Sequence, residues 1–189
     1  MDNKEISLIK NCQKGRLEDF TGLYELYVRK IYDFIYFKTY HRETAEDLAS
    51  QTFIKALENI NTYDFTKGSF NSWLYRVAGN TVIDHYRTRK IEANVEDIWD
   101  LADDVTVTTD LDNQAQLSEV RQYLKKFSPQ QREIVILRLW QQLSYKEIAE
   151  ITGLTEANCK MIYSRIINKL KSELPLQAYL AFLLFNIFN

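Results

Sequence analysis

The chain has 189 residues, enough for one large domain or two small ones, and a hydrophobic content of 46% with only five glycines excludes a disordered or fibrous protein. The formal net charge of −2 hides a segregated distribution: residues 67–90 carry 5 basic and 1 acidic side chains, residues 91–120 carry 9 acidic and no basic ones, and residues 121–173 carry 10 basic and 5 acidic ones. Two basic blocks separated by an acidic segment favour a nucleic-acid partner, because the local charge rather than the total attracts phosphates.

The first predicted elements are helices with a broad apolar face. Residues 4–38 carry apolar groups at helical spacing, and the polar run 41–44 predicts a turn into the next helix. Over residues 45–60 the apolar positions follow the i, i+3, i+4, i+7 rule, with acidic and polar residues on the other face. Residues 61–68 are rich in turn formers and predict a loop. Ser69 is then the expected N-cap of a basic, aromatic-rich helix that runs to about residue 88.

The second half predicts a linker followed by short helices. Residues 91–111 lack a sustained period and predict a flexible linker and a domain boundary. Helical periodicity returns over residues 112–127, and Ser128-Pro129 is a strong start signal with Ser as N-cap and Pro at the first helical position. Further helices are expected at 130–141, at 144–151 and, after a turn at Gly153 and a cap at Thr155, to about residue 174.

These elements predict an all-α fold of two small helical domains joined by an acidic linker. The expected boundaries are 1–90 for the first domain, 91–111 for the linker, 112–174 for the second domain and 175–189 for a short apolar C-terminal helix. The tail has too few apolar residues to cross a membrane, and its apolar stripe favours association. A helix packed on one domain, an autoinhibitory or partner-binding helix and a membrane-surface contact all stay open for it.

Two segments have the residue types that nucleic-acid binding requires. The helix over 69–88 shows Trp, Tyr and His along its length and is followed by Arg and Lys, so it can hold phosphates and stack against unpaired bases. Residues 143–165 form a helix-turn-helix pattern in which Gly153 permits the sharp turn. The exposed N-terminal face of its second helix can reach base edges in the major groove. The combination predicts a protein that binds both duplex and opened strands, as transcription initiation requires.

Three segments resemble the bacterial RNA polymerase sigma-70 family, in its small extracytoplasmic-function (ECF) type: Ala45 to Leu57 (AEDLASQTFIKAL), Gly68 to Arg87 (GSFNSWLYRVAGNTVIDHYR) and Ser128 to Leu170. The resemblance covers nearly the whole chain up to Leu174. It implies a promoter-specificity subunit with a sigma region 2-like domain for core polymerase and the −10 element, and a region 4-like domain for the −35 element. The implied partners are the RNA polymerase core, through its clamp and flap, and promoter DNA. Whether an anti-sigma factor exists stays open.

The resemblance also assigns roles to individual residues. Core-polymerase contact is expected at Asp47, Leu48, Gln51, Phe53 and Ile54, with plain core packing as the alternative for Leu48 and Phe53. The −10 element, with one base flipped into the loop 59–69, is expected to contact Asn61, Tyr63, Asp64, Lys67, Arg76, Asn80, Arg87 and Arg89. The −35 element is expected to contact Thr155, Glu156, Asn158, Lys160, Met161, Ser164 and Arg165.

The residue content argues against an enzyme. No Ser/His/Asp or Cys/His constellation is apparent, and His41 and His85 lack metal-ligand spacing, so we expect no catalytic residue, metal or cofactor. Cys12 and Cys159 form no CxxC pair and no secretory signal is present, so a reducing, cytoplasmic location without integral membrane insertion is expected. A conventional helix-turn-helix regulator with a helical sensor domain is the alternative, and a helical adaptor without a DNA role would leave the two basic blocks unexplained.

Overall fold

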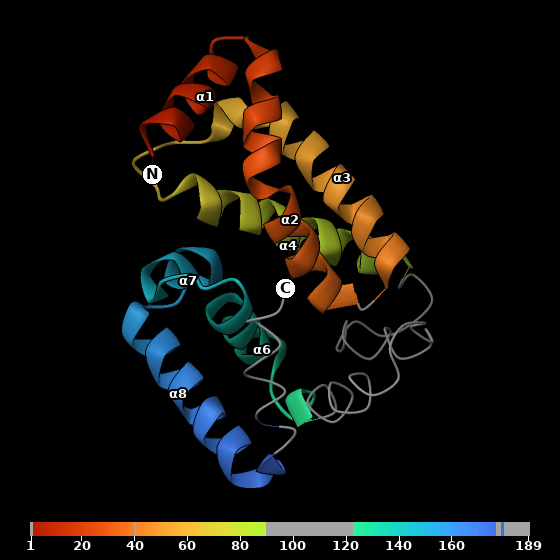
Figure 1. Ribbon diagram of the computed structural model, residues 1–189, viewed down its shortest axis with the longest axis vertical. Helices are drawn as coiled ribbons and strands as arrows, with labels where there is room; N and C mark the ends of the chain where they lie inside the picture. The colour runs from red at the N-terminus through yellow and green to blue at the C-terminus, as the bar shows by residue number, and fades with distance from the viewer. Residues whose placement is uncertain (1, 40, 90–122, 177–178, 180–189) are drawn as a thin grey trace. The chain divides into compact units, whose positions relative to one another are not determined.

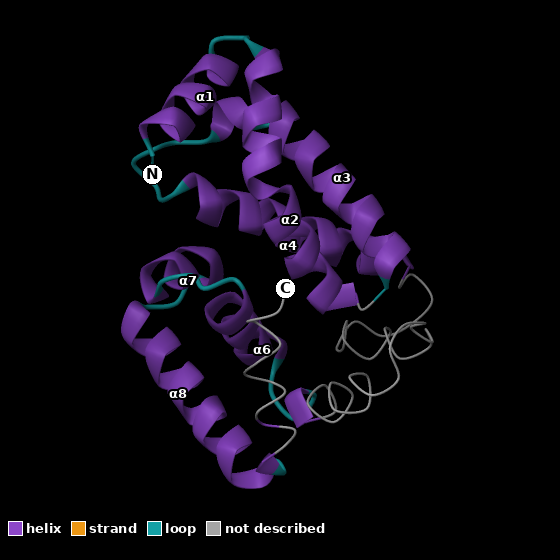
Figure 2. Cartoon of the chain, viewed as in Figure 1, coloured by secondary structure: helices purple, strands orange, loops and turns teal. Residues whose placement is uncertain are grey.

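The computed structural model describes residues 2–39, 41–89, 123–176 and 179 (Figure 1). They fall into two compact units, one within Met1–Val105 and the other within Thr106–Asn189. Every regular element of the described residues is helical (Figure 2), which confirms the predicted all-α fold. The expected linker over 91–111 and most of the expected tail helix over 175–189 lie outside the described residues.

The described residues of the first unit form four helices and two short 3-10 turns. They are α1 (Asn3–Gln13), η1 (Leu17–Asp19), α2 (Phe20–Thr39), α3 (Arg42–Glu58), η2 (Ile60–Thr62) and α4 (Phe70–Arg89). Helices α2, α3 and α4 pack on one another, while α1 lies against α2 and η2 (Figure 1). The apolar stretch 4–38 forms two helices rather than one because the chain turns after α1 at Gly15, whose φ of 90° favours glycine.

The core of the first unit is apolar and aromatic. Ile31, Phe34 and Ile35 of α2 are fully buried, as are Leu74 and Tyr75 of α4. The rings of Phe34 and Tyr75 meet edge to face with centroids 5.0 Å apart. Each such side chain contributes about 1.5–3 kcal/mol by leaving water, so this cluster holds α2 and α4 together.

Local capping sets where α3 and α4 begin. The His41 side chain accepts a hydrogen bond from the Thr44 backbone N–H, so α3 begins at Arg42 and the expected turn over 41–44 is its first turn. The Ser69 hydroxyl accepts the Ser72 N–H at 3.1 Å, which confirms the predicted cap of α4.

The described residues of the second unit form three short helical elements and one long helix, and most of them begin with a side-chain cap. They are α6 (Pro129–Val135), η5 (Ile136–Trp140), α7 (Tyr145–Thr152) and α8 (Glu156–Glu173). Ser128 and Ser144 each form a capping box, and the Thr155 hydroxyl accepts the Asn158 N–H. Gly153 ends α7 with a φ of 73°. The predicted start signals and turn are confirmed, and the helix expected over 130–141 is α6 followed by the π-helical turn η5.

Candidate nucleic-acid and protein interfaces

One side of α3 faces solvent and forms a mixed polar and apolar patch, called here the α3 face. It consists of Asp47, Gln51 and Ile54, which follow each other at i, i+4 and i+7 and are all exposed. Ile54 has 57% of its surface exposed, which is high for an isoleucine in a helix with a buried side. An exposed apolar side chain between polar ones is typical of a protein-binding patch.

The two other residues expected on this surface belong to the core instead. Leu48 is 1% exposed and Phe53 is 5% exposed. The Phe53 ring packs against the rings of Phe20 and Tyr24, with centroids 6.4 and 4.8 Å away. Leu48 and Phe53 are therefore not part of the α3 face, because both use their apolar surface to join α3 to the unit, and the partner contact predicted for them stays a prediction.

The loop 59–69 is a folded turn with an aromatic anchor. Tyr63 is only 5% exposed, its hydroxyl donates to the carbonyl oxygen of Gly68 at 3.1 Å, and its ring packs against Phe70 and Trp73. Tyr63 thus has a structural role in this loop, and the DNA contact predicted for it stays a prediction. Its burial keeps the loop on the unit, and Asn61 lies on the exposed side of the chain.

The second half of this loop is ordered by a carboxylate. The Asp64 side chain accepts hydrogen bonds from the backbone N–H and the hydroxyl of Thr66, both at 2.8 Å. These bonds lower the pKa of Asp64, because they favour its charged form. Lys67 is exposed, with its Nζ 3.8 Å from an Asp64 oxygen. Asn61 and Lys67 are therefore the two exposed residues among the four that the sequence predicts for the −10 element in this loop.

Helix α4 presents a second exposed stripe, called here the α4 face. It consists of Arg76, Asn80, Ile83 and Arg87, which share one side of the helix by their spacing; Arg76 is half-buried and the others are exposed. The side chain of Arg89, also expected at the −10 element, lies outside the described residues. Two arginines, an amide and an apolar side chain on one stripe can hold phosphates and contact bases.

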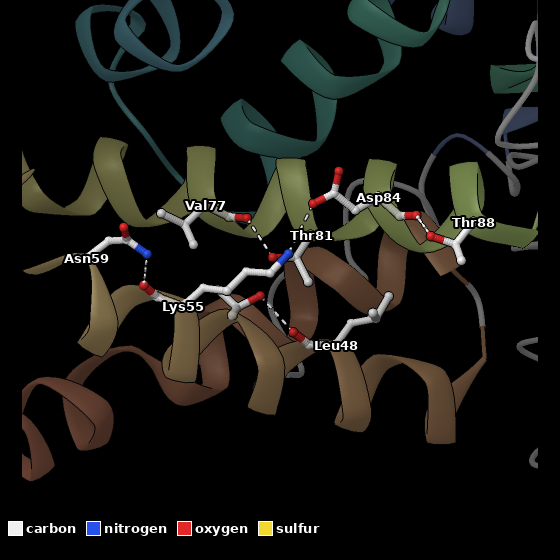
Figure 3. A network of polar contacts seen from close by, with 8 residues as sticks. Leu48, Lys55, Asn59, Val77, Thr81, Asp84 and Thr88 are labelled. Carbon is white, nitrogen blue, oxygen red and sulfur yellow. Dashed lines mark hydrogen bonds and ion pairs between the residues drawn. The ribbon is translucent and has the colours of Figure 1, made fainter.

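A cross-helix ion pair and threonine back-bonds support the other side of α4. Figure 3 shows Lys55 of α3 reaching Asp84 of α4, with Nζ and Oδ2 3.1 Å apart. The hydroxyls of Thr81 and Thr88 donate to the carbonyl oxygens of Val77 and Asp84 (Figure 3). Asp84 is thereby engaged with α3, and the α4 face is left to the positively charged and amide side chains.

The helix-turn-helix exposes the whole surface that the sequence predicts for the −35 element. This recognition face is formed by exposed residues at the start and along one side of α8: Thr155, Glu156, Asn158, Lys160, Met161, Ser164 and Arg165. On the opposite side of α8, Cys159, Ile166 and Leu170 are buried against the rest of the unit. The first turn of such a helix also points its backbone N–H groups outward, which favours phosphate.

The described ranges contain no candidate metal centre and no candidate membrane span. No group of three His, Cys, Asp or Glu side chains there could hold a metal ion. No helix within those ranges is both long and apolar enough to cross a bilayer.

Comparison with known proteins places two family models on the chain: sigma-70 region 2 matches residues 23–91 and sigma-70 region 4 matches residues 117–170. The chain is 36% identical over 157 residues to the RNA polymerase sigma factor YlaC of Bacillus subtilis, covering 79% of this chain and 89% of that protein. It is 34% identical over 178 residues to the ECF RNA polymerase sigma factor BldN of Streptomyces coelicolor, covering 90% of this chain and 66% of that protein. Its fold is similar to that of the sigma factor RpoE of Bartonella quintana, solved in complex with the anti-sigma factor NepR. The TM-score is 0.61 at 24% identity, covering 82% of this chain and 96% of that one.

Proposed function

Because the chain belongs to the sigma-70 family of RNA polymerase sigma factors, and to its ECF type, we propose how its exposed side chains divide the work of promoter recognition. The protein directs transcription initiation, binds RNA polymerase and promoter DNA, and is not an enzyme. This membership overturns the alternatives of a conventional regulator and of an adaptor without a DNA role. The finer assignments below rest on the exposure and chemistry of individual residues.

The recognition face of α8 is assigned to the −35 element as duplex. Its start is capped locally, so its side chains are held at fixed positions before DNA arrives. Asn158 has the amide that pairs with adenine in the major groove, Met161 can contact a thymine methyl group, and Arg165 can bind guanine or a phosphate. The observation that carries this assignment is that every residue of the face is exposed while the other side of α8 is buried.

The loop 59–69 and the α4 face are assigned to the opened −10 element. Extruding a base costs a few kcal/mol, and a preformed polar pocket can offset this cost. Among the exposed polar residues of the loop, we assign the contact with the extruded base to Asn61 and Lys67. Arg76, Asn80 and Arg87 of the α4 face then hold the adjoining backbone.

The α3 face is assigned to the polymerase core. Its three exposed residues combine a carboxylate, an amide and an isoleucine, and hydrophobic anchors surrounded by polar groups carry most of the affinity in protein interfaces. We therefore propose that Asp47, Gln51 and Ile54 contact the clamp. The domain boundaries proposed for these roles are 1–90, with a linker over 91–111, and 112–174, with a separate tail over 175–189.

The cellular setting follows from the partners. We place the protein in the cytoplasm with the polymerase and the promoter, where the buried thiols of Cys12 and Cys159 stay reduced. RpoE of Bartonella quintana binds the anti-sigma factor NepR. We propose that this chain too has an anti-sigma partner, and binding to purified candidate proteins, with and without core polymerase as competitor, tests it.

Run-off transcription with core polymerase tests the assignments. Three variants each probe one surface: Ile54→Ala for the α3 face, Arg87→Ala for the α4 face and Asn158→Ala for the recognition face. Ile54→Ala is expected to weaken holoenzyme formation, whereas the other two variants form holoenzyme normally. Arg87→Ala is expected to alter the preference for the −10 sequence, and Asn158→Ala the preference for the −35 sequence. Arg29→Ala is the matched control, because Arg29 is an exposed arginine of α2 outside the three surfaces. Equal loss in all variants, or none, would contradict the division of roles.

A further inference from the structure

A side chain of α1 holds the turn that precedes the exposed part of the loop. The Nε2 of Gln13 donates to the carbonyl oxygen of Ile60 at 3.1 Å and to that of Tyr63 at 2.8 Å. An amide nitrogen has two hydrogens to donate, and both are used on carbonyl groups three residues apart. Gln13 therefore bridges the two ends of one short turn, 47 and 50 residues away along the chain.

The bridged turn carries the residue that the loop offers to DNA. Between the two bridged carbonyls lie Asn61 and Thr62, which are both exposed, while Ile60 and Tyr63 on either side are 1% and 5% exposed. The turn has its own backbone bond from the Tyr63 N–H to the Ile60 carbonyl oxygen at 3.2 Å. The burial of Ile60 and Tyr63 fixes the two ends of the turn, and the hydrogen bonds from Gln13 fix the directions of their carbonyl groups. Asn61, between them, is exposed to solvent.

Helix α1 also supports the junction between this loop and α4. The Tyr27 hydroxyl donates to the Glu5 carboxylate at 2.6 Å in the interior, and the Tyr27 ring packs on Phe70 at 5.7 Å. Phe70 in turn packs on Tyr63 at 5.3 Å. The N-terminal part of α1 is thus connected to Tyr63 of the loop through Tyr27 and Phe70, while the last residue of α1, Gln13, holds the turn directly.

We propose that Gln13 is a positioning residue for base recognition in the −10 element, acting through the turn that presents Asn61. This inference rests on the proposed function of the loop 59–69. A turn already held in its binding conformation does not lose the entropy of ordering when the base arrives. If one residue of the turn must instead be ordered on binding, the affinity falls about tenfold, because that is the factor to which the entropy cost of ordering one backbone residue corresponds. The loss of affinity is expected only at the promoter position whose base contacts the turn, and the preferences at the other promoter positions stay unchanged.

The test compares transcription from a promoter series that carries all four bases at each −10 position, using holoenzyme. Gln13→Met keeps the length of the side chain and removes both donors. Gln13→Asn keeps the amide but is too short to bridge both carbonyls, and it serves if the methionine variant does not fold. Asn11→Ala is the control, because the Asn11 side chain on the same helix accepts a hydrogen bond from Arg16 at 2.6 Å and forms none with the described loop 59–69.

We expect Gln13→Met to lower transcription from the preferred promoter about tenfold and to flatten the base preference at one position, the same position that Asn61→Ala flattens. Core binding and the −35 preference stay as in the parent protein. The double variant is expected to be no weaker than Asn61→Ala alone, because both changes remove one shared interaction. Asn11→Ala keeps the full preference.

Three results would overturn the inference in distinguishable ways. If Asn61→Ala flattens one position and neither Gln13 variant does, the loop reads the base but Gln13 does not position it. If no variant changes any −10 preference while transcription continues, the proposed function of the loop itself is wrong. If the Gln13 variants lower transcription equally for every base, in step with a lower melting temperature, Gln13 only stabilises the fold.

Discussion

The two surfaces that we propose bind DNA in this sigma factor are built by opposite means. The recognition face of α8 depends on neighbours in sequence: Thr155 caps the helix and Gly153 turns the chain ahead of it. The first turn of the loop 59–69 depends on a residue far away along the chain, since Gln13 holds it, while Tyr63 fixes the loop to the nearby Phe70. A cap made by neighbouring residues is expected to persist when other parts of its unit change, whereas a turn held from another helix changes when that support changes.

Removing the aromatic support should have the largest effect on this contrast. Phe70 is fully buried and its ring meets those of Tyr27, Tyr63 and Trp73. Phe70→Ala is expected to lower the free energy of unfolding of the first unit by about 3–5 kcal/mol, because it leaves a cavity where three elements meet. Thermal unfolding followed by circular dichroism measures this loss.

The second unit provides the control for that variant. Binding of Phe70→Ala to duplex −35 DNA is expected to equal that of the parent, because the recognition face owes nothing to the aromatic cluster. A matching loss of duplex binding would mean that the two surfaces are not independent.

Removing a local cap should have a smaller effect, confined to the second unit. Thr155→Ala deletes the hydroxyl that accepts the Asn158 N–H at 3.2 Å, and the loss of such a cap costs about 1 kcal/mol. We expect weaker duplex binding with an unchanged −10 preference. Thr155→Ser restores the hydroxyl and is expected to restore binding; failure to do so would show that the methyl group, and not the cap, is what matters.

The same difference explains how far sequence reasoning reaches. The caps at Ser128 and Thr155 were predicted because each signal lies within a few residues of the helix it starts, whereas Ser144 was expected inside its helix and is its cap. Periodicity predicts that a segment is a helix, but it does not predict as well which of the apolar residues on that helix are exposed to solvent. Ile54 is exposed, whereas Leu48 and Phe53 are buried, and their alternative reading as core residues is the correct one.

The loop is where sequence patterns gave the least. No local spacing marks Tyr63 as buried, because a tyrosine in a turn-rich segment serves equally well as an anchor or as a stacking surface. No pattern marks Gln13 at all, since its partners are backbone carbonyls 47 and 50 residues away. The signal that could have suggested it is a lone amide at the end of an amphipathic helix, which is too common to be specific.

A glycine on α4 allows stability and DNA binding to be separated. A Cβ atom at Gly79 would meet nothing within 4 Å, and Gly79 adjoins Asn80 of the α4 face. Gly79→Ala is therefore expected to raise the free energy of unfolding by about 0.5–1 kcal/mol, because alanine favours the helix. If nucleic acid approaches α4 closely there, opening of the −10 element falls despite the gain in stability. A loss of stability would contradict the open space beside Gly79.

The smallest expected effect is on the pKa values of two carboxyl groups, and it tests whether the loop is formed before DNA binds. The Thr66 hydrogen bonds lower the pKa of Asp64, whereas burial raises the pKa of Asp33 on α2. The two carboxyl groups should therefore ionise in a fixed order as the pH rises, Asp64 below the ordinary value near 3.9 and Asp33 above it. Carboxyl-carbon NMR shifts measured from acid to neutral pH give both midpoints.

The sign of the linkage fixes where the loop depends on pH. Since the folded-state pKa of Asp64 is depressed, the stabilisation from its charged form is fully present above the unfolded-state value and is lost as the pH falls through the lower, folded-state value. The Thr66 amide resonance should accordingly stay unchanged through the neutral range and move only in acid. Asp64→Ala removes the acceptor and should move that resonance at every pH, while Asp33→Ala leaves it in place. A midpoint for Asp64 at its ordinary value would mean that the turn around Thr66 forms only when DNA is bound, so that the recognition helix would be preformed and this part of the loop would not.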